Sequence, residues 1–396
     1  MITLSELLGI EFPTIFHLTV TGRCNANCVG CINSLIYGER GSFAEKWEDG
    51  FEKNISALRF LIKKSKNGRI FLSFYGGEPL LVFDKVLKYY QFINQEFPEK
   101  KIKFVLFTNG MLLHKALQKN EEFFKNLELL IISIDGKKEQ HERFRRGTDF
   151  DQIIANLSLF RNKSKAKVLM WSTIREEMSL KDCVEEFLLL REEALCDYFF
   201  WHLIEAEKPI RNFQEFRRKY LAELKFLFDL FETSLSRGEI LPFLPFCELF
   251  YFLLKGVKRG QTGCGIEKLR NFDILGGKLF PCVDLGEEIE IKFNLEGDRE
   301  KPFEGVKKEL LNLVSYKFSF GCNQCEAEFY CGGRCPVLIK TSPERARQYC
   351  ELTKDMVGLA KSRAEAVRML LERAGFSLED LYYPYGYIVL LTDVVP

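Results

Sequence analysis

Residues 14–31 read TIFHLTVTGRCNANCVGC, an apolar, β-branched run that leads into three closely spaced cysteines. Residues 14–20 predict a buried strand. Cys24, Cys28 and Cys31 follow in one loop, at intervals of four and three. Three thiols are an odd number for disulfides, and structural zinc takes four ligands, commonly from two CxxC pairs. The spacing favours three corners of an iron–sulfur cubane with one open iron, with zinc and a remote fourth ligand as the alternative.

Length and composition restrict the class of protein. The chain has 396 residues, 46% of them hydrophobic, which suggests one large domain plus a smaller one, or two of ordinary size. Its 57 Lys and Arg nearly balance 56 Asp and Glu, so we expect neither a nucleic-acid nor a membrane partner. The first residues, MITLSELLGIEF, do not resemble a signal peptide, and no apolar run reaches about 18 residues. Thirteen cysteines in such a chain suggest metal binding in the cytoplasm.

Apolar runs alternate with helical patterns from residue 12 to about 237. The runs that predict strands are TIFHLTV, RIFLSFYG, IKFVLFTNG, LELLIISID, AKVLMWSTI and DYFFWHLI. Helices are predicted between them, for example over residues 54–66, 83–97 and 150–161. Continuous apolar strands are typical of a parallel sheet covered by helices. Six such units fit an α/β fold, either a partial barrel or an open doubly wound sheet.

Polar motifs follow the first four predicted strands, each at the point where the strand ends. They are TGRC, YGGEP, TNG and SIDG. Ligands of parallel α/β proteins bind at the carboxyl ends of the strands. The sequence therefore predicts that these motifs share one site.

A CxxxCxxC loop after the first strand of a βα-repeat chain resembles the signature of the radical S-adenosylmethionine (SAM) enzymes. The resemblance implies a partial (β/α)6 TIM-like barrel in which Cys24, Cys28 and Cys31 hold a four-iron four-sulfur cluster. SAM would chelate the open iron through its amino and carboxylate groups. Reductive cleavage of SAM would then give a 5′-deoxyadenosyl radical that removes a hydrogen atom from the substrate.

YGGEP resembles the GGEP motif of this family, which contacts the SAM ammonium group. Gly76 and Gly77 would let the main chain approach the ligand, and Glu78 could accept from the amine. An ordinary glycine turn is the alternative.

SIDG and the basic stretch behind it extend the resemblance. Ser133 would contact the SAM ribose or carboxylate, with Asp135 near it. Arg145 stands where related maturases carry an arginine for the SAM carboxylate, a role suited to a guanidinium. The neighbouring Arg143 and Arg146 leave this choice open, and a solvated basic turn is the alternative. His141 is interpreted as structural.

Seven further cysteines and Gly277 match the spacing of the SPASM domain, a C-terminal extension of one radical SAM subgroup. The cysteines are Cys264, Cys282, Cys322, Cys325, Cys331, Cys335 and Cys350. By resemblance, one auxiliary four-iron cluster is closed by Cys322, Cys325, Cys331 and Cys350. Cys264, Cys282 and Cys335 would hold the other, completed by Cys247 or left with an open iron. A zinc ribbon is the alternative for residues 322–335.

The predicted domains are the radical SAM partial barrel (1–240), a small irregular SPASM domain stabilised by iron–sulfur clusters (241–360), and a C-terminal helix and tail (361–396). With the SAM-binding cluster, the cofactors would be SAM and three [4Fe–4S] clusters. A flavodoxin or ferredoxin would supply the electron.

SPASM proteins most often modify peptides or small proteins, so the resemblance implies a maturase of a ribosomally made peptide. A small-molecule or carbohydrate substrate, and sulfatase-type formylglycine formation, are the alternatives. The sulfatase-type enzymes carry their base directly after the second SPASM cysteine, where this chain has Val283. Asp284, one position later, is a weak candidate for the catalytic base, with an exposed turn acid as the alternative. Only 23 residues precede Cys24, so a leader peptide would need a separate binding protein or the barrel mouth.

Overall fold

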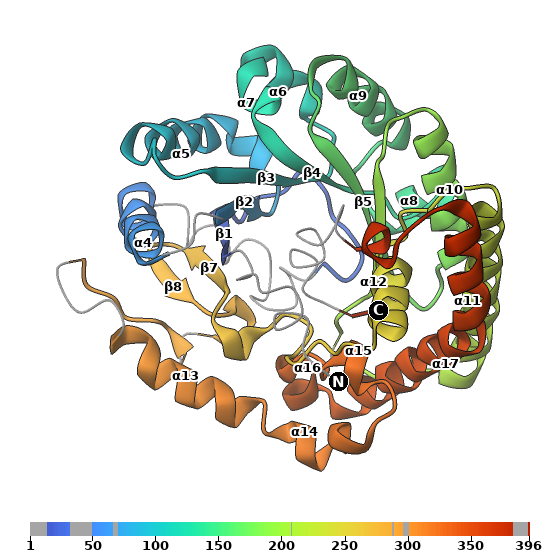
Figure 1. Cartoon of the computed structure of the whole chain (residues 1–396). Helices are drawn as coiled ribbons and strands as arrows, with labels where there is room; N and C mark the ends of the chain where they lie inside the picture. Colours follow the sequence, from blue (N-terminus) through green and yellow to red (C-terminus); the bar gives the residue numbers. More distant parts are fainter. Residues whose placement is uncertain are drawn as a thin grey trace.

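The fold is built on one eight-stranded sheet, seen nearly end-on in Figure 1. The computed structural model describes residues 14–31, 50–65, 70–206, 208–286, 289–295, 301–382 and 395–396. The strand order is β6-β5-β4-β3-β2-β1-β7-β8, so the first six strands lie side by side in chain order. The N-terminal residues and most of the C-terminal tail, which belong to the first and last predicted domains, lie outside the described residues.

The first six strands are all parallel and correspond to the six predicted runs. They are β1 (Thr14–Thr21), β2 (Ile70–Gly76), β3 (Ile102–Thr108), β4 (Leu127–Ser133), β5 (Lys167–Ile174) and β6 (Tyr198–Leu203). Their order never reverses, as it would in a doubly wound sheet, and the helices lie on the outer side of the curved sheet, so the predicted α/β partial barrel is confirmed.

Helices connect consecutive strands and cover the outer side of the curved sheet (Figure 1). The bounds are α4 (Phe51–Lys64), η1 (Pro79–Val82), α5 (Phe83–Glu96), α6 (Leu113–Lys119), α7 (Glu121–Lys125), α8 (Lys138–Phe144), α9 (Phe150–Lys163), α10 (Leu180–Glu192) and α11 (Phe213–Ser236). The predicted helices over 54–66, 83–97 and 150–161 match α4, α5 and α9, with ends that differ by at most three residues.

Aromatic side chains fill the layer between the sheet and its helices. Phe74 of β2 stacks on Phe104 of β3, with ring centroids 6.1 Å apart, and Phe123 of α7 lies 5.9 Å from Phe74. Phe74 and Phe123 are both fully buried. Burying a side chain of this size contributes roughly 1.5–3 kcal/mol, so this layer stabilises the barrel without help from a metal.

A short hairpin adds two strands that the sequence interpretation did not include. β7 (Asn271–Leu275) pairs in parallel with β1, and β8 (Lys278–Phe280) pairs antiparallel with β7. Gly276 and Gly277 form the two-residue turn, with φ of +58° and +79°. This conformation favours glycine at both positions. The start of the predicted SPASM domain thus continues the barrel sheet.

The rest of the chain is helical and irregular. Its elements are α12 (Leu244–Lys255), η2 (Ile266–Lys268), η3 (Val283–Leu285), α13 (Lys301–Leu313), α14 (Tyr316–Ser319), η5 (Cys322–Gln324), α15 (Glu328–Cys331), α16 (Pro336–Thr341), α17 (Pro343–Ala374) and η6 (Leu378–Leu381). α17 packs on α11, where Arg217 pairs with Asp355 at 2.6 Å. α17 continues through residue 360, and the domain division there stays a prediction. Within the described chain, no helix has the length and apolar character needed to span a membrane.

Candidate metal and cofactor site

The loop that carries the first three cysteines leaves the carboxyl end of β1. We call residues 21–31 the cysteine loop. Cys24, Cys28 and Cys31 are half-buried free thiols. The Cys24 sulfur accepts from the Ala26 amide at 3.4 Å. Burial raises the pKa of Cys24 to about 11, so binding of a metal there would release a proton.

The glycines of YGGEP bring the end of β2 against the cysteine loop. The Gly77 amide donates to Thr21 O at 2.9 Å, and the Glu78 amide donates to Arg23 O at 2.8 Å. A Cβ on Gly77 would lie 2.1 Å from Arg23 O, closer than any side chain allows. Gly76 has a φ of +134° and is similarly close to Thr21 O. The glycines therefore permit the close backbone contact that fixes the start of the cysteine loop.

Glu78 is held by hydrogen bonds within the protein, and its predicted contact with the SAM amine stays a prediction. Its side chain is fully buried and accepts from Thr108 Oγ1 and the Asn109 amide, both at 2.8 Å, and from the Leu80 amide at 3.1 Å. Burial raises the pKa of Glu78 to about 7, although these hydrogen bonds oppose the shift. In this structure the carboxylate joins the ends of β2 and β3 and does not face outward.

Asn109, in the TNG motif after β3, is a site residue that the sequence interpretation did not select. Its Nδ2 donates to Asn25 Oδ1 at 2.8 Å and lies 3.9 Å from the Cys24 sulfur. Asn109 is 7% exposed. The position of TNG at a strand end was the available signal, and the structure shows that its amide side chain reaches the cysteine loop.

The SIDG motif places a buried acid beside the predicted arginine. Asp135 is fully buried, and Arg145 donates to it through Nε (2.7 Å) and Nη2 (3.1 Å). Arg143 and Arg146 are exposed, so Arg145 is the inward arginine of the three. Ser133 ends β4 and is half-buried. Asp135 therefore orients Arg145 in this structure.

His141 is structural, as predicted. It is fully buried, its Nδ1 accepts from the Asp135 amide at 3.2 Å, and its Nε2 lies 3.1 Å from Thr148 Oγ1. Burial lowers the pKa of His141 to about 4. The neutral ring thus fixes the backbone of Asp135.

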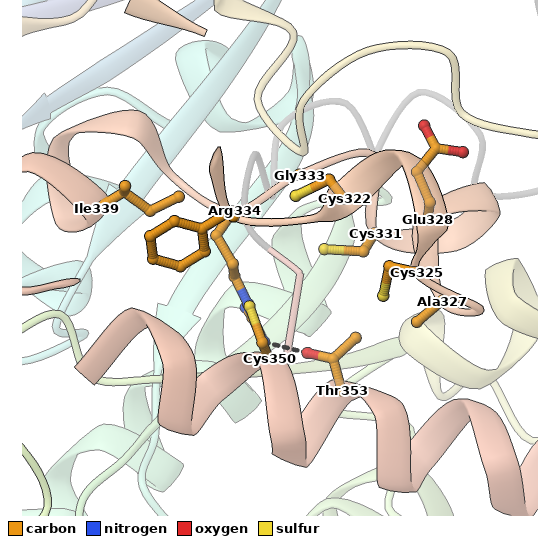
Figure 2. Close-up of a pocket in the computed structure, with 11 residues that line it drawn as sticks. Cys322, Cys325, Ala327, Glu328, Cys331, Gly333, Arg334, Ile339, Cys350 and Thr353 are labelled. Atoms are coloured by element: carbon orange, nitrogen blue, oxygen red, sulfur yellow. Dashed lines mark hydrogen bonds between the residues drawn. The ribbon is translucent and has the colours of Figure 1, made fainter. Parts of the chain in front are cut away.

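Four of the predicted SPASM cysteines line one pocket, which we call the distal thiol pocket. Cys322 lies in η5 and Cys325 follows it, while Cys331 ends α15 and Cys350 lies on α17. In Figure 2 the sulfurs of the first three point into a common space, and Cys350 projects toward it from the long helix.

The donor set of the distal thiol pocket fits an iron–sulfur cluster. Four thiols from one pocket are the usual ligands of a four-iron cluster. Within the described residues, no three Cys, His, Asp or Glu side chains converge to hold a single metal ion. The distal cluster therefore stays a prediction, with the zinc ribbon as its alternative.

The remaining three SPASM cysteines interact with one another and with nearby acids. Burial raises the pKa of Cys282 well above its usual value, and the charges of Asp284, Asp273, Cys335 and Cys264 raise it further. Burial likewise raises the pKa of Cys335, with Glu205 as the next contributor. The charges of Cys264 and Cys335 thus act on Cys282, and the second cluster that these three cysteines would hold stays a prediction.

Cys247, the alternative ligand of the second cluster, lies on α12 and is 1% exposed. Its thiol donates to Leu241 O at 3.4 Å, and burial raises its pKa. Completion of the second cluster by Cys247 or by an open iron stays a prediction.

Asp284 is half-buried beside Cys282, and is not the exposed turn acid considered as its alternative. Its turn is fixed by Asp273, whose Oδ2 accepts from the Val283 amide at 2.8 Å. Burial and the charge of Asp273 raise the pKa of Asp284 to about 7. Glu205, two residues after β6, is half-buried, and burial raises its pKa to about 7. Neither Asp273 nor Glu205 was predicted as a site residue.

With this geometry established, comparisons with known proteins identify the domain. The family model described as the Radical SAM superfamily matches residues 18–177, which include the cysteine loop and the first five strands. Over these residues the chain is similar to the radical SAM superfamily. The similarity implies SAM and one [4Fe–4S] cluster as cofactors.

Curated relatives of the radical SAM domain include two named enzymes. The chain is 28% identical to the radical SAM cyclopropyl synthase TigE of Paramaledivibacter caminithermalis over 34% of its own length and 29% of TigE. It is 25% identical to a cysteine-type anaerobic sulfatase-maturating enzyme of Clostridium novyi, over 66% of this chain and 71% of that enzyme. The chain spans less than a third of TigE, so activity, substrate and partners remain proposals.

Solved structures share the fold over nearly the whole chain. The structure of anSMEcpe with bound AdoMet has a TM-score of 0.72 at 20% identity, covering 95% of this chain and 99% of that chain. SuiB of Streptococcus suis bound to S-adenosylmethionine gives 0.51 at 18% identity, over 86% and 77% of the two chains. At these identities the likeness concerns the fold, which includes the cysteine-rich part of this chain.

Proposed function

We propose that this chain is a radical SAM enzyme that oxidises or cross-links a residue of a ribosomally made peptide or small protein. The observation that carries the proposal is the cysteine loop. It lies where the strand-end motifs meet, and contacts from Gly77, Glu78 and Asn109 fix it. A loop preorganised in this way suits a cluster that must keep one iron open to SAM.

The residues of the site have distinct proposed roles. Cys24, Cys28 and Cys31 hold the SAM-binding cluster. Gly76 and Gly77 bring the main chain close to the ligand, with Ser133 beside it. Arg145, oriented by Asp135, pairs with the SAM carboxylate. When bound, SAM and the iron–sulfur clusters supply one-electron chemistry: a radical that removes a hydrogen atom, and an acceptor for the electron that the substrate then loses.

Asp284 is proposed to take the proton that leaves the substrate. The substrate gives up a hydrogen atom, an electron and a proton, so its product is lighter by two hydrogens. Asp284 lies beside Cys282, where an open iron would border the substrate. Cys322, Cys325, Cys331 and Cys350 hold the distal auxiliary cluster. A flavodoxin or ferredoxin supplies the electron, a separate protein can bind a leader peptide, and the reaction takes place in the cytoplasm.

Sulfatase-type formylglycine formation is a second candidate, favoured by the similarity to the Clostridium novyi enzyme. A structural neighbour was solved with AdoMet and a peptide bound, which supports a peptide substrate for either candidate. Val283 at the position of the sulfatase-type base argues against formylglycine formation. A small-molecule or carbohydrate substrate is the third candidate.

The proposal is tested by anaerobic reconstitution followed by reaction with SAM and dithionite. We expect about twelve irons per chain and release of 5′-deoxyadenosine, with no release from the Cys28→Ala variant. Short peptides encoded beside this gene are then incubated with the enzyme and analysed by mass spectrometry. Loss of two hydrogens supports the maturase, and formylglycine in a sulfatase-derived peptide supports the second candidate. Absence of 5′-deoxyadenosine from the wild-type protein contradicts radical SAM activity.

A further inference from the structure

Asp135 is a buried carboxylate shared by two arginines. It follows the end of β4 and has no exposed surface. Arg145 donates to both of its oxygens, and Arg175 Nη1 donates to Oδ2 at 2.8 Å. The Thr173 amide donates to Oδ1 at 2.9 Å. Burial disfavours the charge, but Arg145 and Arg175 outweigh it and keep the pKa of Asp135 well below its usual range.

Arg175 extends from this carboxylate to the cysteine loop. It is 5% exposed and follows directly after β5. Its Nε donates to Val29 O at 2.8 Å, while its Nη1 also donates to Thr173 O at 2.7 Å. The guanidinium therefore lies between a fixed acid and the backbone between Cys28 and Cys31.

The same stretch of the cysteine loop is held from its other side. The Val29 amide donates to Phe144 O at 2.8 Å, and the Asn27 amide donates to Arg146 O at 2.6 Å. The Arg175 guanidinium also lies over the Phe144 ring, 5.5 Å from the centroid of that ring. The Val29 carbonyl is thus fixed by Arg175, and the Val29 amide is fixed by Phe144, the residue before Arg145.

We propose that Arg175 is a positioning residue for the SAM-binding cluster and that Asp135 couples it to Arg145. Arg175 sets the Val29 carbonyl, and with it the relative positions of the Cys28 and Cys31 thiols. The anion that holds Arg175 also orients Arg145 toward the SAM carboxylate. The inference rests on the proposed function, because it assumes that the three cysteines bind the cluster that takes SAM.

The coupling predicts that a change at Arg175 affects SAM binding without direct contact with SAM. Arg175→Met removes the hydrogen bond to Val29 O and one of the two cations on Asp135. Arg175→Lys keeps the cation, but a single ammonium cannot reproduce the planar fork that serves Val29 and Asp135 together. We therefore expect the methionine variant to be affected more strongly than the lysine variant.

The test compares reconstituted wild-type, Arg175→Met and Arg175→Lys proteins, each holding its clusters. The readouts are iron per chain, the electron paramagnetic resonance spectrum of the reduced protein with and without SAM, and the dissociation constant of SAM. We expect Arg175→Met to weaken SAM binding about tenfold or more and to shift the g-values of the SAM-responsive signal. Signals that do not respond to SAM should stay unchanged. The SAM affinity of Arg175→Lys should lie between those of the wild type and Arg175→Met.

Arg161→Met is the matched control. Arg161 also pairs with an aspartate, Asp197, and donates to two carbonyls, Leu195 O (3.1 Å) and Ala166 O (2.9 Å). These contacts lie at the opposite end of β5. We expect this variant to lose thermal stability while its SAM affinity and g-values match those of the wild type.

The outcomes separate the inference from the proposed function. If wild-type protein shows no SAM-responsive signal, both are contradicted. If it does, but Arg175→Met and Arg175→Lys bind SAM with wild-type affinity and g-values, only the positioning role is overturned. If Arg175→Met does not fold, Arg175→Lys decides by the same readouts.

Discussion

The cysteine loop and the distal thiol pocket carry the same ligand chemistry but are held in different ways. The cysteine loop receives hydrogen bonds from residues that are far away in the sequence, such as Gly77, Asn109 and Arg175. In the distal thiol pocket, the turn at Cys322–Cys325 is closed by backbone bonds between residues three apart, as from the Cys325 amide to Cys322 O at 3.1 Å. Asn323, Gln324 and Glu326 around this turn are exposed.

This difference suggests a division of labour between protein and metal. At the cysteine loop the barrel provides the geometry, so a cluster can be bound with one iron left open. At the distal thiol pocket, Arg334 already joins the segment after α15 to α17 by donating to Tyr349 O at 2.8 Å. The exposed turn at Cys322–Cys325 has mainly local bonds, so the cluster would supply much of its connection. Metal binding contributes to folding wherever the unfolded chain lacks a formed site.

Removal of iron has the largest expected effect, because it tests whether the distal thiol pocket depends on metal while the barrel does not. After anaerobic chelation we expect residues 322–350 to lose amide protection, because the predicted cluster crosslinks η5, α15 and α17. Protection of β2–β5 should be retained, since the buried aromatic layer and the parallel ladder stabilise these strands. Hydrogen exchange with mass spectrometry on holo and iron-free protein measures both regions at once.

The control is a Cys322→Ala variant, which should show the same loss in residues 322–350 before chelation. Equal protection of this region in holo and iron-free protein would contradict the structural role of the distal cluster. Loss of protection across β2–β5 would instead show that the barrel also depends on metal.

The sequence predicted the barrel well because its signals are local. Each of the six strands is a continuous apolar run, and each is long enough to be distinguished from the helix that follows it. β7 and β8 have five and three residues and were missed. The Gly276–Gly277 pair between two apolar runs was a hairpin signal, but its pairing with β1 joins residues more than 250 positions apart, which no local pattern reveals.

The candidate site was predictable to a similar extent. Strand-end motifs identified the residues that gather around the cysteine loop, since the carboxyl ends of parallel strands meet at one edge. They did not reveal partners. Arg175 lies in an unremarkable STIREE stretch, and its contact with Val29 O spans 146 positions. Nor did the strand-end motifs reveal that the buried Glu78 carboxylate accepts from the Asn109 amide at the end of the next strand.

Asn109→Ala is a smaller, local change that tests how the barrel holds the cysteine loop. The substitution removes the hydrogen bond to Asn25 Oδ1 and the weak contact to the Cys24 sulfur. Hydrogen bonds to cluster sulfurs and outer-shell contacts influence potential and activity. We expect about a tenfold slower release of 5′-deoxyadenosine and a loss of about 1 kcal/mol in the free energy of unfolding.

Asn120→Ala is the matched control for this substitution. Asn120 caps α7, where its side chain accepts from the Phe123 amide at 2.8 Å. Loss of such a cap costs about 1 kcal/mol, with no effect expected on SAM cleavage. Equal rates for Asn109→Ala and Asn120→Ala would show that the contact at Cys24 has no functional role.

The last expected effect concerns the stability of the barrel alone, with no change in activity, and its dependence on pH. Glu186 of α10 is 7% exposed, and burial together with the charge of Asp182 raises its pKa to about 7. The folded state therefore binds the proton more tightly than the unfolded state, and this group makes the barrel less stable as pH rises from about 4.5 to 7.

Glu186→Gln removes this charge, so the variant should be more stable than wild type at pH 8. The expected gain is about 1–2 kcal/mol, since solvent screens part of the effect. The gain should vanish at pH 4, where the wild-type carboxyl is neutral. Urea unfolding of iron-free protein, followed by tryptophan fluorescence, measures both values, and a gain of the same size at both pH values would assign the effect to packing and not to charge.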